Sequence, residues 1–174
     1  MSLPTTRVLV LSADLFEDSE LLYPMLRLRE EEAEVVLATP GGEPITGKRG
    51  HGPVAADASF EQVAADAFDA VVVPGGFAPD AVRRSPAALD LIRAFDLAGK
   101  PVAIICHAGW VPISAGIVAG RRVTGFHAIR DDLVNAGVEW VDEPVVVDGT
   151  LISARHPGDL GPWMKALIAA LAAD

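Results

Sequence analysis

The sequence predicts a three-layer α/β sandwich, in which a doubly wound, mostly parallel sheet is covered by helices on both faces. Strand-like and helix-like segments alternate along the whole chain. Residues 70–73 (AVVV) and 102–105 (VAII) are apolar at every position, which is typical of parallel strands buried on both faces. Half of the 174 residues (51%) are hydrophobic, enough for a sizeable core. Because no linker or repeat interrupts the pattern, we expect one domain spanning residues 1–174.

The first half of the chain is expected to hold three strands and one helix. We expect strands at 7–13 and 34–38, a helix at 19–32, and a strand buried on both faces at 70–73. Residues 40–53 contain five glycines and indicate a loop or a β-ribbon excursion.

The second half continues the alternation and ends in a helix. Ser85-Pro86 is a helix start with proline at the first helical position, and Gly99 is the matching stop. Beyond it we expect a strand at 102–105, helices at 108–115 and 128–136, a hairpin at 145–153 turning at Asp148-Gly149, and a final amphipathic helix over 160–171.

Composition excludes several classes of function. Fourteen basic against twenty-four acidic side chains give a net charge of −10, which disfavours nucleic-acid and anionic-membrane binders. Cys106 is the sole cysteine, so neither an intrachain disulfide nor a cysteine-based zinc cluster is expected. The histidines are scattered and no G-x-G-x-x-G opens a helix, so we expect no metal and no dinucleotide cofactor. With no signal peptide or apolar span in the sequence, a cytoplasmic protein is expected.

Three predicted strand ends carry residues suited to chemistry. Residues 14–18 (DLFED) follow the first strand, Gly75-Gly76 follow the AVVV strand, and Cys106-His107 follow the VAII strand. Ligands bind beyond the carboxyl ends of the strands in such sheets, so we expect these segments to meet there.

Cys106 lies at a strand-to-helix turn, the position of a nucleophile elbow. A helix N-terminus beside the sulfur would favour the thiolate, and the sharp turn would lift the side chain clear of its neighbours. The alternative is a buried structural cysteine that ends a core strand.

The other candidates have equally simple structural alternatives. His107 could meet substrate beside the sulfur, and the N–H groups of Gly75 and Gly76 could bind an oxyanion, although two glycines also form ordinary turns. Glu17 is the candidate carboxyl group, expected to hydrogen-bond the sulfur with a raised pKa, or else a first-turn acid of the helix.

Several segments together resemble the intracellular protease PfpI family of the ThiJ/PfpI superfamily. The similarity covers essentially the whole chain in order: 16–21 (FEDSEL), 45–48 (ITGK), 73–76 (VPGG), 103–107 (AIICH), 113–116 (ISAG), 131–140 (DDLVNAGVEW) and 145–149 (VVVDG).

The resemblance implies a flavodoxin-like fold of the class I glutamine amidotransferase type, assembly as a dimer or hexamer, and a role in stress tolerance. It implies that Cys106 is the nucleophile, that His107 is its histidine and that Glu17 is the carboxyl group touching the thiol. Asp80 matches the position at which the peptidase branch typically has a glutamate that completes a triad in a neighbouring subunit. We also place His127 among the substrate-binding candidates.

The sequence departs from the peptidase pattern in three places. The elbow continues as Ala108-Gly109 where that branch often has Gly-Pro, Pro112 falls inside the following helix, and the turn at 124–127 lacks the tyrosine of some members. These differences weigh against peptidase activity more than against the nucleophile itself.

The leading interpretation is a cysteine-dependent hydrolase acting on glyoxals or on glycated protein or nucleotide adducts, with no cofactor. A cysteine peptidase acting on peptides uses the same groups. A non-enzymatic redox sensor or chaperone-like stress protein is the rival from another class, and a nucleotide-binding module is the weakest because no phosphate loop is visible.

Overall fold

The structure, a computed structural model, describes residues 2–173 and is built around one seven-stranded sheet. The strand order is β3 (Ala58–Ser59), β2 (Glu34–Thr39), β1 (Arg7–Leu11), β4 (Ala70–Val73), β5 (Val102–Ile105), β9 (Leu151–Ala154) and β8 (Val145–Asp148). Every pairing is parallel except the antiparallel β8–β9 hairpin. The mostly parallel sheet expected from the sequence is confirmed.

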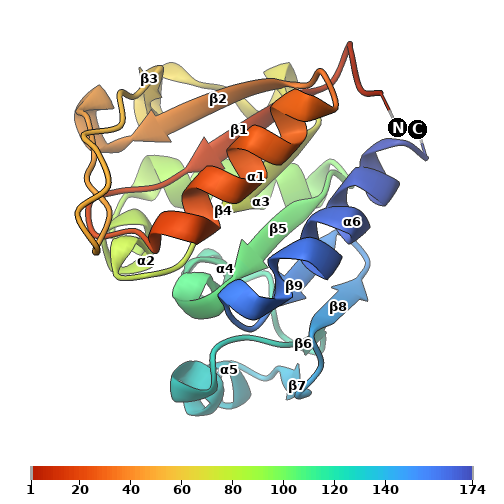
Figure 1. Cartoon of the computed structure of the whole chain (residues 1–174). Coiled ribbons are helices and arrows are strands. Elements are labelled where there is room, and N and C mark those ends of the chain that lie inside the picture. Colours follow the sequence, from red (N-terminus) through yellow and green to blue (C-terminus); the bar gives the residue numbers. More distant parts are fainter. Residues whose placement is uncertain (1, 174) are drawn as a thin grey trace.

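Helices cover both faces of this sheet (Figure 1). One face carries α1 (Asp18–Glu30) and α6 (Leu160–Leu171), and the other carries α2 (Ala78–Arg83), α3 (Pro86–Leu97) and α4 (Trp110–Ala115). A small lobe beside β8 contains β6 (Arg122–Val123), α5 (Arg130–Asn135) and β7 (Glu139–Trp140). No helix within residues 2–173 is long and apolar enough to cross a membrane.

The central strands are buried because both of their faces pack against helices. Every residue of β4 and β5 is buried, as the continuous apolar runs predicted. The indole of Trp163 on α6 is fully buried and donates a hydrogen bond to the carbonyl of Ile152 on β9 at 3.2 Å, which fixes α6 against the sheet.

The elements that sequence patterns did not predict are short. Strands β3, β6 and β7 have two residues each, too few for any alternation of apolar and polar residues to show. The helix expected over 108–115 is split, because a 3₁₀ turn over Cys106–Gly109 precedes α4. The glycine-rich excursion is a ribbon closed by paired hydrogen bonds between Ile45 and Val54.

The sheet order brings the three predicted strand ends together. Strands β1, β4 and β5 are adjacent and parallel, so their carboxyl ends lie at one edge. Phe16, after β1, forms an isolated bridge with Gly76, after β4. Cys106 follows β5 directly, at the same edge. The expected convergence of these segments is confirmed.

Candidate active site

Cys106 occupies a strained turn at the carboxyl end of β5. Its φ of 61° lies in the left-handed region, which residues other than glycine rarely adopt. The carbonyl of Cys106 accepts a hydrogen bond from the N–H of Phe126 at 3.2 Å, which anchors the turn. The side chain is only 6% exposed. The strained turn holds this side chain at a fixed point at the carboxyl end of β5.

Two glycines after β4 allow the backbone to approach this sulfur. A Cβ on Gly75 would lie 2.6 Å from the Cβ of Cys106, and a Cβ on Gly76, whose φ is 78°, would lie 2.3 Å from the N of Glu17. The Gly75 N–H donates to Oε2 of Glu20 at 2.9 Å. The Gly76 N–H instead donates toward the Cys106 sulfur. The Gly75 N–H is therefore occupied by Glu20, and of the two expected oxyanion donors only the Gly76 N–H faces the sulfur.

The carboxyl group that contacts the thiol belongs to Glu20, which corrects the expectation for Glu17. Glu20 is fully buried, and its carboxyl group lies close enough to the Cys106 thiol for each to shift the pKa of the other. Glu17 precedes α1 and turns the other way, with its carboxylate 2.6 Å from Nζ of Lys48 and 3.6 Å from Nε of Arg49. Helical geometry explains the difference, because Glu20 lies within the first turn of α1 on its buried face.

A sequence signal for Glu20 exists. The buried residues of α1 are Glu20, Leu21, Pro24, Met25 and Leu28, which recur at intervals of three and four. Glu20 is therefore a lone acid on an apolar stripe, whereas Glu17 lies outside the helix. Residue type does not distinguish Glu20 from Glu17 and Asp18. The helical period does, because it places only Glu20 on the buried face of α1.

Burial dominates the electrostatics of the Glu20–Cys106 pair. It raises the pKa of Glu20 to about 7, and the negative charge of Glu17 adds to the shift, while the Gly75 N–H opposes it. Burial, followed by the charge of Glu20, raises the pKa of the Cys106 thiol to about 12. The N–H groups of Gly76 and His107 oppose that rise. Protonation of Glu20 removes the repulsion, so a proton on Glu20 favours the thiolate.

His107 lies beside the sulfur as the sequence suggested. Its Nδ1 is 3.2 Å from Sγ of Cys106. Burial lowers the pKa of His107, and the positive charges of Lys48 and His127 lower it further, which favours a neutral imidazole. The ring packs between Trp110, at 5.3 Å between centroids, and Phe126, at 4.9 Å. A neutral imidazole held in this position can accept the thiol proton.

Asp80 lies on the surface of this chain, next to a broad hollow. Its carboxylate side chain is 63% exposed and pairs with Nε of Arg84 at 3.5 Å. The hollow has a volume of about 470 Å³ and is lined by Asp14, Leu15, Phe77, Asp80, Ala81, Arg84 and Trp110. Leu15 and Phe77 are 52% and 64% exposed, so apolar surface surrounds Asp80.

The Phe126 ring lies between His127 and His107. The imidazole of His127 is tilted against the Phe126 ring, with 4.3 Å between the ring centroids, and the same Phe126 ring contacts His107. His127 lines a separate pocket of about 230 Å³ whose other walls are Gly125, Phe126, Trp140, Asp142, Arg155 and His156. No group of three or more potential metal-ligating side chains is found within residues 2–173.

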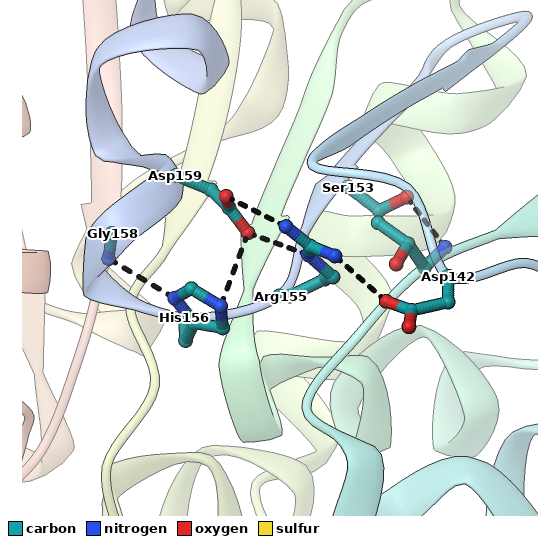
Figure 2. Close-up of polar contacts among 7 residues, drawn as sticks. Asp142, Ser153, Arg155, His156, Gly158 and Asp159 are labelled. Carbon is teal, nitrogen blue, oxygen red and sulfur yellow. Dashed lines mark hydrogen bonds and ion pairs between the residues drawn. The ribbon is translucent and has the colours of Figure 1, made fainter.

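Sequence patterns did not single out the polar residues of this second pocket. Figure 2 shows Arg155 between two carboxylates, with Asp159 at 2.9 Å from Nε and Asp142 at 2.8 Å from Nη1. Nδ1 of His156 accepts from the N–H of Gly158 at 3.1 Å. Only the position of Arg155 in the sequence could have indicated it, because Arg155 follows β9 at the same sheet edge as Cys106.

Known proteins resemble this chain along nearly its whole length. Residues 6–170 match the DJ-1/PfpI family. The chain is 50% identical over 162 residues to a protein of Pyrococcus furiosus named Deglycase PfpI, covering 93% of this chain and 97% of that protein. It is 37% identical over 169 residues to Protein/nucleic acid deglycase 2 of Escherichia coli, covering 96% and 98%. The crystal structure of Drosophila melanogaster DJ-1beta superposes with a TM-score of 0.90 at 32% identity, covering all of this chain and 92% of that one. The chain belongs to the DJ-1/PfpI family.

Proposed function

We propose that this protein is a cysteine-dependent deglycase, with Cys106 as nucleophile, that acts on glyoxals and on the adducts they form with amines. The observation that carries the proposal is the group around one sulfur: a strained elbow, Nδ1 of His107 at 3.2 Å, and the N–H groups of Gly76 and His107. The names of the relatives from Pyrococcus furiosus and Escherichia coli support it.

The first step is addition of sulfur to an aldehyde carbon. The S–C bond forms while the thiol proton passes to Nδ1 of His107, and the carbonyl oxygen becomes an oxyanion. The N–H groups of Gly76 and His107 point at the sulfur, so they also face an oxygen bound to the carbon that sulfur attacks. Return of the proton to that oxygen gives a thiohemiacetal. With an amine carbinol as substrate, the same bond forms and the amine leaves with the proton.

The second step is a proton shift, for which Glu20 is well suited. In the thiohemiacetal of a 2-oxo aldehyde, the C–H proton moves to the neighbouring carbon, and the hydroxyl proton passes to the oxygen on that carbon. The product is the thioester of a 2-hydroxy acid. Water then cleaves the S–C bond and restores the thiol, so that the sum is glyoxal plus water to hydroxy acid. Glu20, with a pKa raised to about 7, can both take up and release a proton near neutral pH.

The electrostatics favour this role over non-enzymatic redox sensing. Oxidation of a sensor cysteine follows thiolate character and exposure. Cys106 is 6% exposed and its thiol pKa is raised by burial. The sulfur becomes reactive when a substrate lets His107 take its proton.

We further propose that the protein works as a homo-oligomer whose interface includes the hollow around Asp80. Exposed apolar side chains, Leu15 and Phe77, border this hollow. Asp80 would then approach His107 of a neighbouring subunit, as the family resemblance implies. Asp is one methylene shorter than Glu, so we expect a water-mediated pair and weak peptidase activity.

Turnover of methylglyoxal compared with that of denatured casein tests the proposal. We expect formation of lactate from methylglyoxal, measured enzymatically, and release of free amine from methylglyoxal-treated lysine peptides, with little hydrolysis of casein. Casein hydrolysis without lactate formation would instead identify a peptidase. Selective oxidation of Cys106 by peroxide with neither turnover would identify a redox sensor.

A further inference from the structure

The imidazole of His107 needs a fixed orientation, because only one of its ring nitrogens faces the sulfur. Nδ1 lies 3.2 Å from Sγ of Cys106. A half-turn of the ring about its Cβ–Cγ bond would place a carbon there and end the proton transfer. In nucleophile–base pairs a third group orients the base, commonly a carboxylate bound to the other nitrogen. Within residues 2–173, Nε2 of His107 has no hydrogen-bond partner, so within one subunit packing alone orients the ring.

Two aromatic rings supply that packing. Trp110 meets the imidazole edge to face, with 5.3 Å between the ring centroids and 64° between the planes. Phe126 lies at 4.9 Å with a smaller angle of 31°. An edge-to-face contact is directional, because the positive edge of one ring faces the negative face of the other. The place and tilt of the Trp110 indole therefore limit how far the His107 ring can turn.

The indole of Trp110 is itself fixed by two polar contacts. Its Nε1 donates a hydrogen bond to Oδ2 of Asp132 on α5 at 2.8 Å. The guanidinium of Arg83 lies over the ring, 5.6 Å from its centroid. Arg83 is in turn tied to α4, because its Nε donates to Oγ of Ser114 at 2.9 Å. One contact holds the edge of the indole and the other holds its face, so the ring has little freedom to move.

The helix that carries Asp132 packs tightly on the nucleophile turn. A Cβ on Gly109 would lie 2.9 Å from Cδ1 of Ile129, and a Cβ on Gly125 would lie 3.2 Å from Cδ1 of Leu133. Ile129 and Leu133 are both buried. Glycine at these two positions therefore allows the start of α5 to approach the turn that follows β5. Asp132, one residue before Leu133, is held at a fixed place relative to that turn.

We propose that Trp110, anchored by Asp132, is a positioning residue that keeps Nδ1 of His107 directed at the sulfur of Cys106. The inference rests on the proposed function and adds to it the group that orients the base. Asp132 takes the part of the orienting acid at one remove, because it acts on the imidazole through the indole rather than by a direct hydrogen bond. The small lobe thereby influences proton transfer at the end of β5.

The state of the ring can be measured without turnover, so the result does not depend on whether the protein is a deglycase. The full-length protein is labelled with ¹⁵N-histidine, and the ring signals of His107 are assigned by their loss in His107→Asn. We expect the wild-type ring to carry its proton on Nε2 and to leave Nδ1 free. Asp132→Ala should raise the share of other ring forms about threefold, the effect of losing one exposed hydrogen bond. Asp132→Asn keeps an acceptor oxygen and should not. An unchanged ring in Asp132→Ala, or equal changes in both variants, would overturn the proposal.

Kinetics separate positioning from binding and folding. In Trp110→Phe and in Asp132→Ala, we expect kcat for methylglyoxal to fall about threefold with KM unchanged, and alkylation of Cys106 by iodoacetamide near neutral pH to slow by the same factor. The double variant should be no slower than either single variant, because both changes remove the same hydrogen bond. Asp131→Ala removes the neighbouring exposed acid in the first turn of α5 and should change neither rate. Additive losses in the double variant, or an equal loss in Asp131→Ala, would refute the role of Asp132 as the anchor.

Discussion

At the scale of single residues, the Cys106 thiol and the two ionisable groups beside it control where protons reside. Glu20 has a raised pKa, the Cys106 thiol has a raised pKa, and the pKa of His107 is lowered. Burial is the first cause of all three shifts, because it penalises whichever form is charged. The thiol and the imidazole are therefore favoured in their neutral forms, while Glu20, with a pKa raised to about 7, exchanges its proton near neutral pH.

Replacement of Cys106 should abolish activity and preserve the fold. We expect Cys106→Ala and Cys106→Ser to lower kcat/KM for methylglyoxal by about a thousandfold or more, because no other nucleophile takes part. Alanine loses about 1 kcal/mol of buried contact at most, so the thermal transition should shift by only a few degrees. Lactate formation by Cys106→Ala at the wild-type rate would contradict the nucleophile assignment.

Glu20→Gln should change how stability depends on pH. The pKa of Glu20 rises from an ordinary value of 4.5 to about 7, so its protonated form is favoured by folding. The stability that this preference contributes is complete below pH 4.5 and is lost as the pH rises to about 7, by about 3 kcal/mol. The amide of the substituted side chain cannot ionise. Between pH 4.5 and 7, the free energy of unfolding should therefore fall in the wild type but not in the variant. Urea denaturation at several pH values measures this difference.

Glu17→Gln is the matched control for that experiment. Glu17 lies at the start of the same helix but pairs with Lys48, and its charge acts on the site through Glu20. We expect the pH dependence of stability between pH 4.5 and 7 to persist in Glu17→Gln. If the pH dependence disappeared in Glu17→Gln and persisted in Glu20→Gln, Glu17 would be the carboxyl group with the raised pKa.

The sequence was sufficient to place Cys106 and His107 at the sheet edge but not to identify the carboxyl group beside the thiol. Cys106-His107 stands out because a fully apolar strand ends there. Glu17, Asp18 and Glu20 share one segment, and only the packing of α1 on the sheet turns one of them inward. The pocket of Trp140, Asp142 and Arg155 draws on several separate segments, so no local pattern could reveal it.

At the scale of elements, two turns at the sheet edge determine the geometry of the site. The turn after β4 supplies Gly75 and Gly76, and the turn after β5 supplies Cys106. Inner strands were predictable from their apolar runs, and so were the main helices from their periodicity and end signals. The two-residue strands were not, because pairing of such short segments depends on neighbours distant in the chain.

Gly76→Ala should destabilise the protein more than an equivalent change elsewhere. Its φ of 78° is unfavourable for alanine, and its added Cβ would lie 2.3 Å from the backbone N of Glu17. Strain and overpacking together should cost about 2–4 kcal/mol in the free energy of unfolding. Gly99→Ala, at a similar φ of 74° with open space around it, should cost about 1 kcal/mol. Equal losses measured by urea denaturation would show that the close approach has no effect.

At the scale of the whole molecule, the apolar surface around Asp80 predicts self-association. We expect sedimentation velocity at micromolar concentration to show a dimer or larger species, and Phe77→Ser to shift it toward monomer, because Phe77 is 64% exposed beside the hollow. A wild-type monomer at this concentration would rule the interface out.

The contribution of Asp80 to a neighbouring site can be separated from assembly. We expect Asp80→Asn to lower any residual hydrolysis of casein severalfold while the oligomer persists. Asp90→Asn is the control, since Asp90 is likewise an exposed acid paired with a nearby arginine, Arg93 at 2.6 Å. Unchanged activities in Asp80→Asn would mean that the acid only favours the start of α2, at whose first turn it lies.

The positive φ of Cys106 has an evolutionary consequence. In an ordinary strand or helix, glycine is about 0.5–1 kcal/mol worse than alanine, but at a left-handed position the order reverses. Cys106→Gly should therefore unfold at a higher temperature than Cys106→Ala, although it buries less. Selection for stability alone would drive position 106 toward glycine. The cysteine persists there only as long as its sulfur is useful, so a lineage that no longer needs the activity should drift to glycine at this position first.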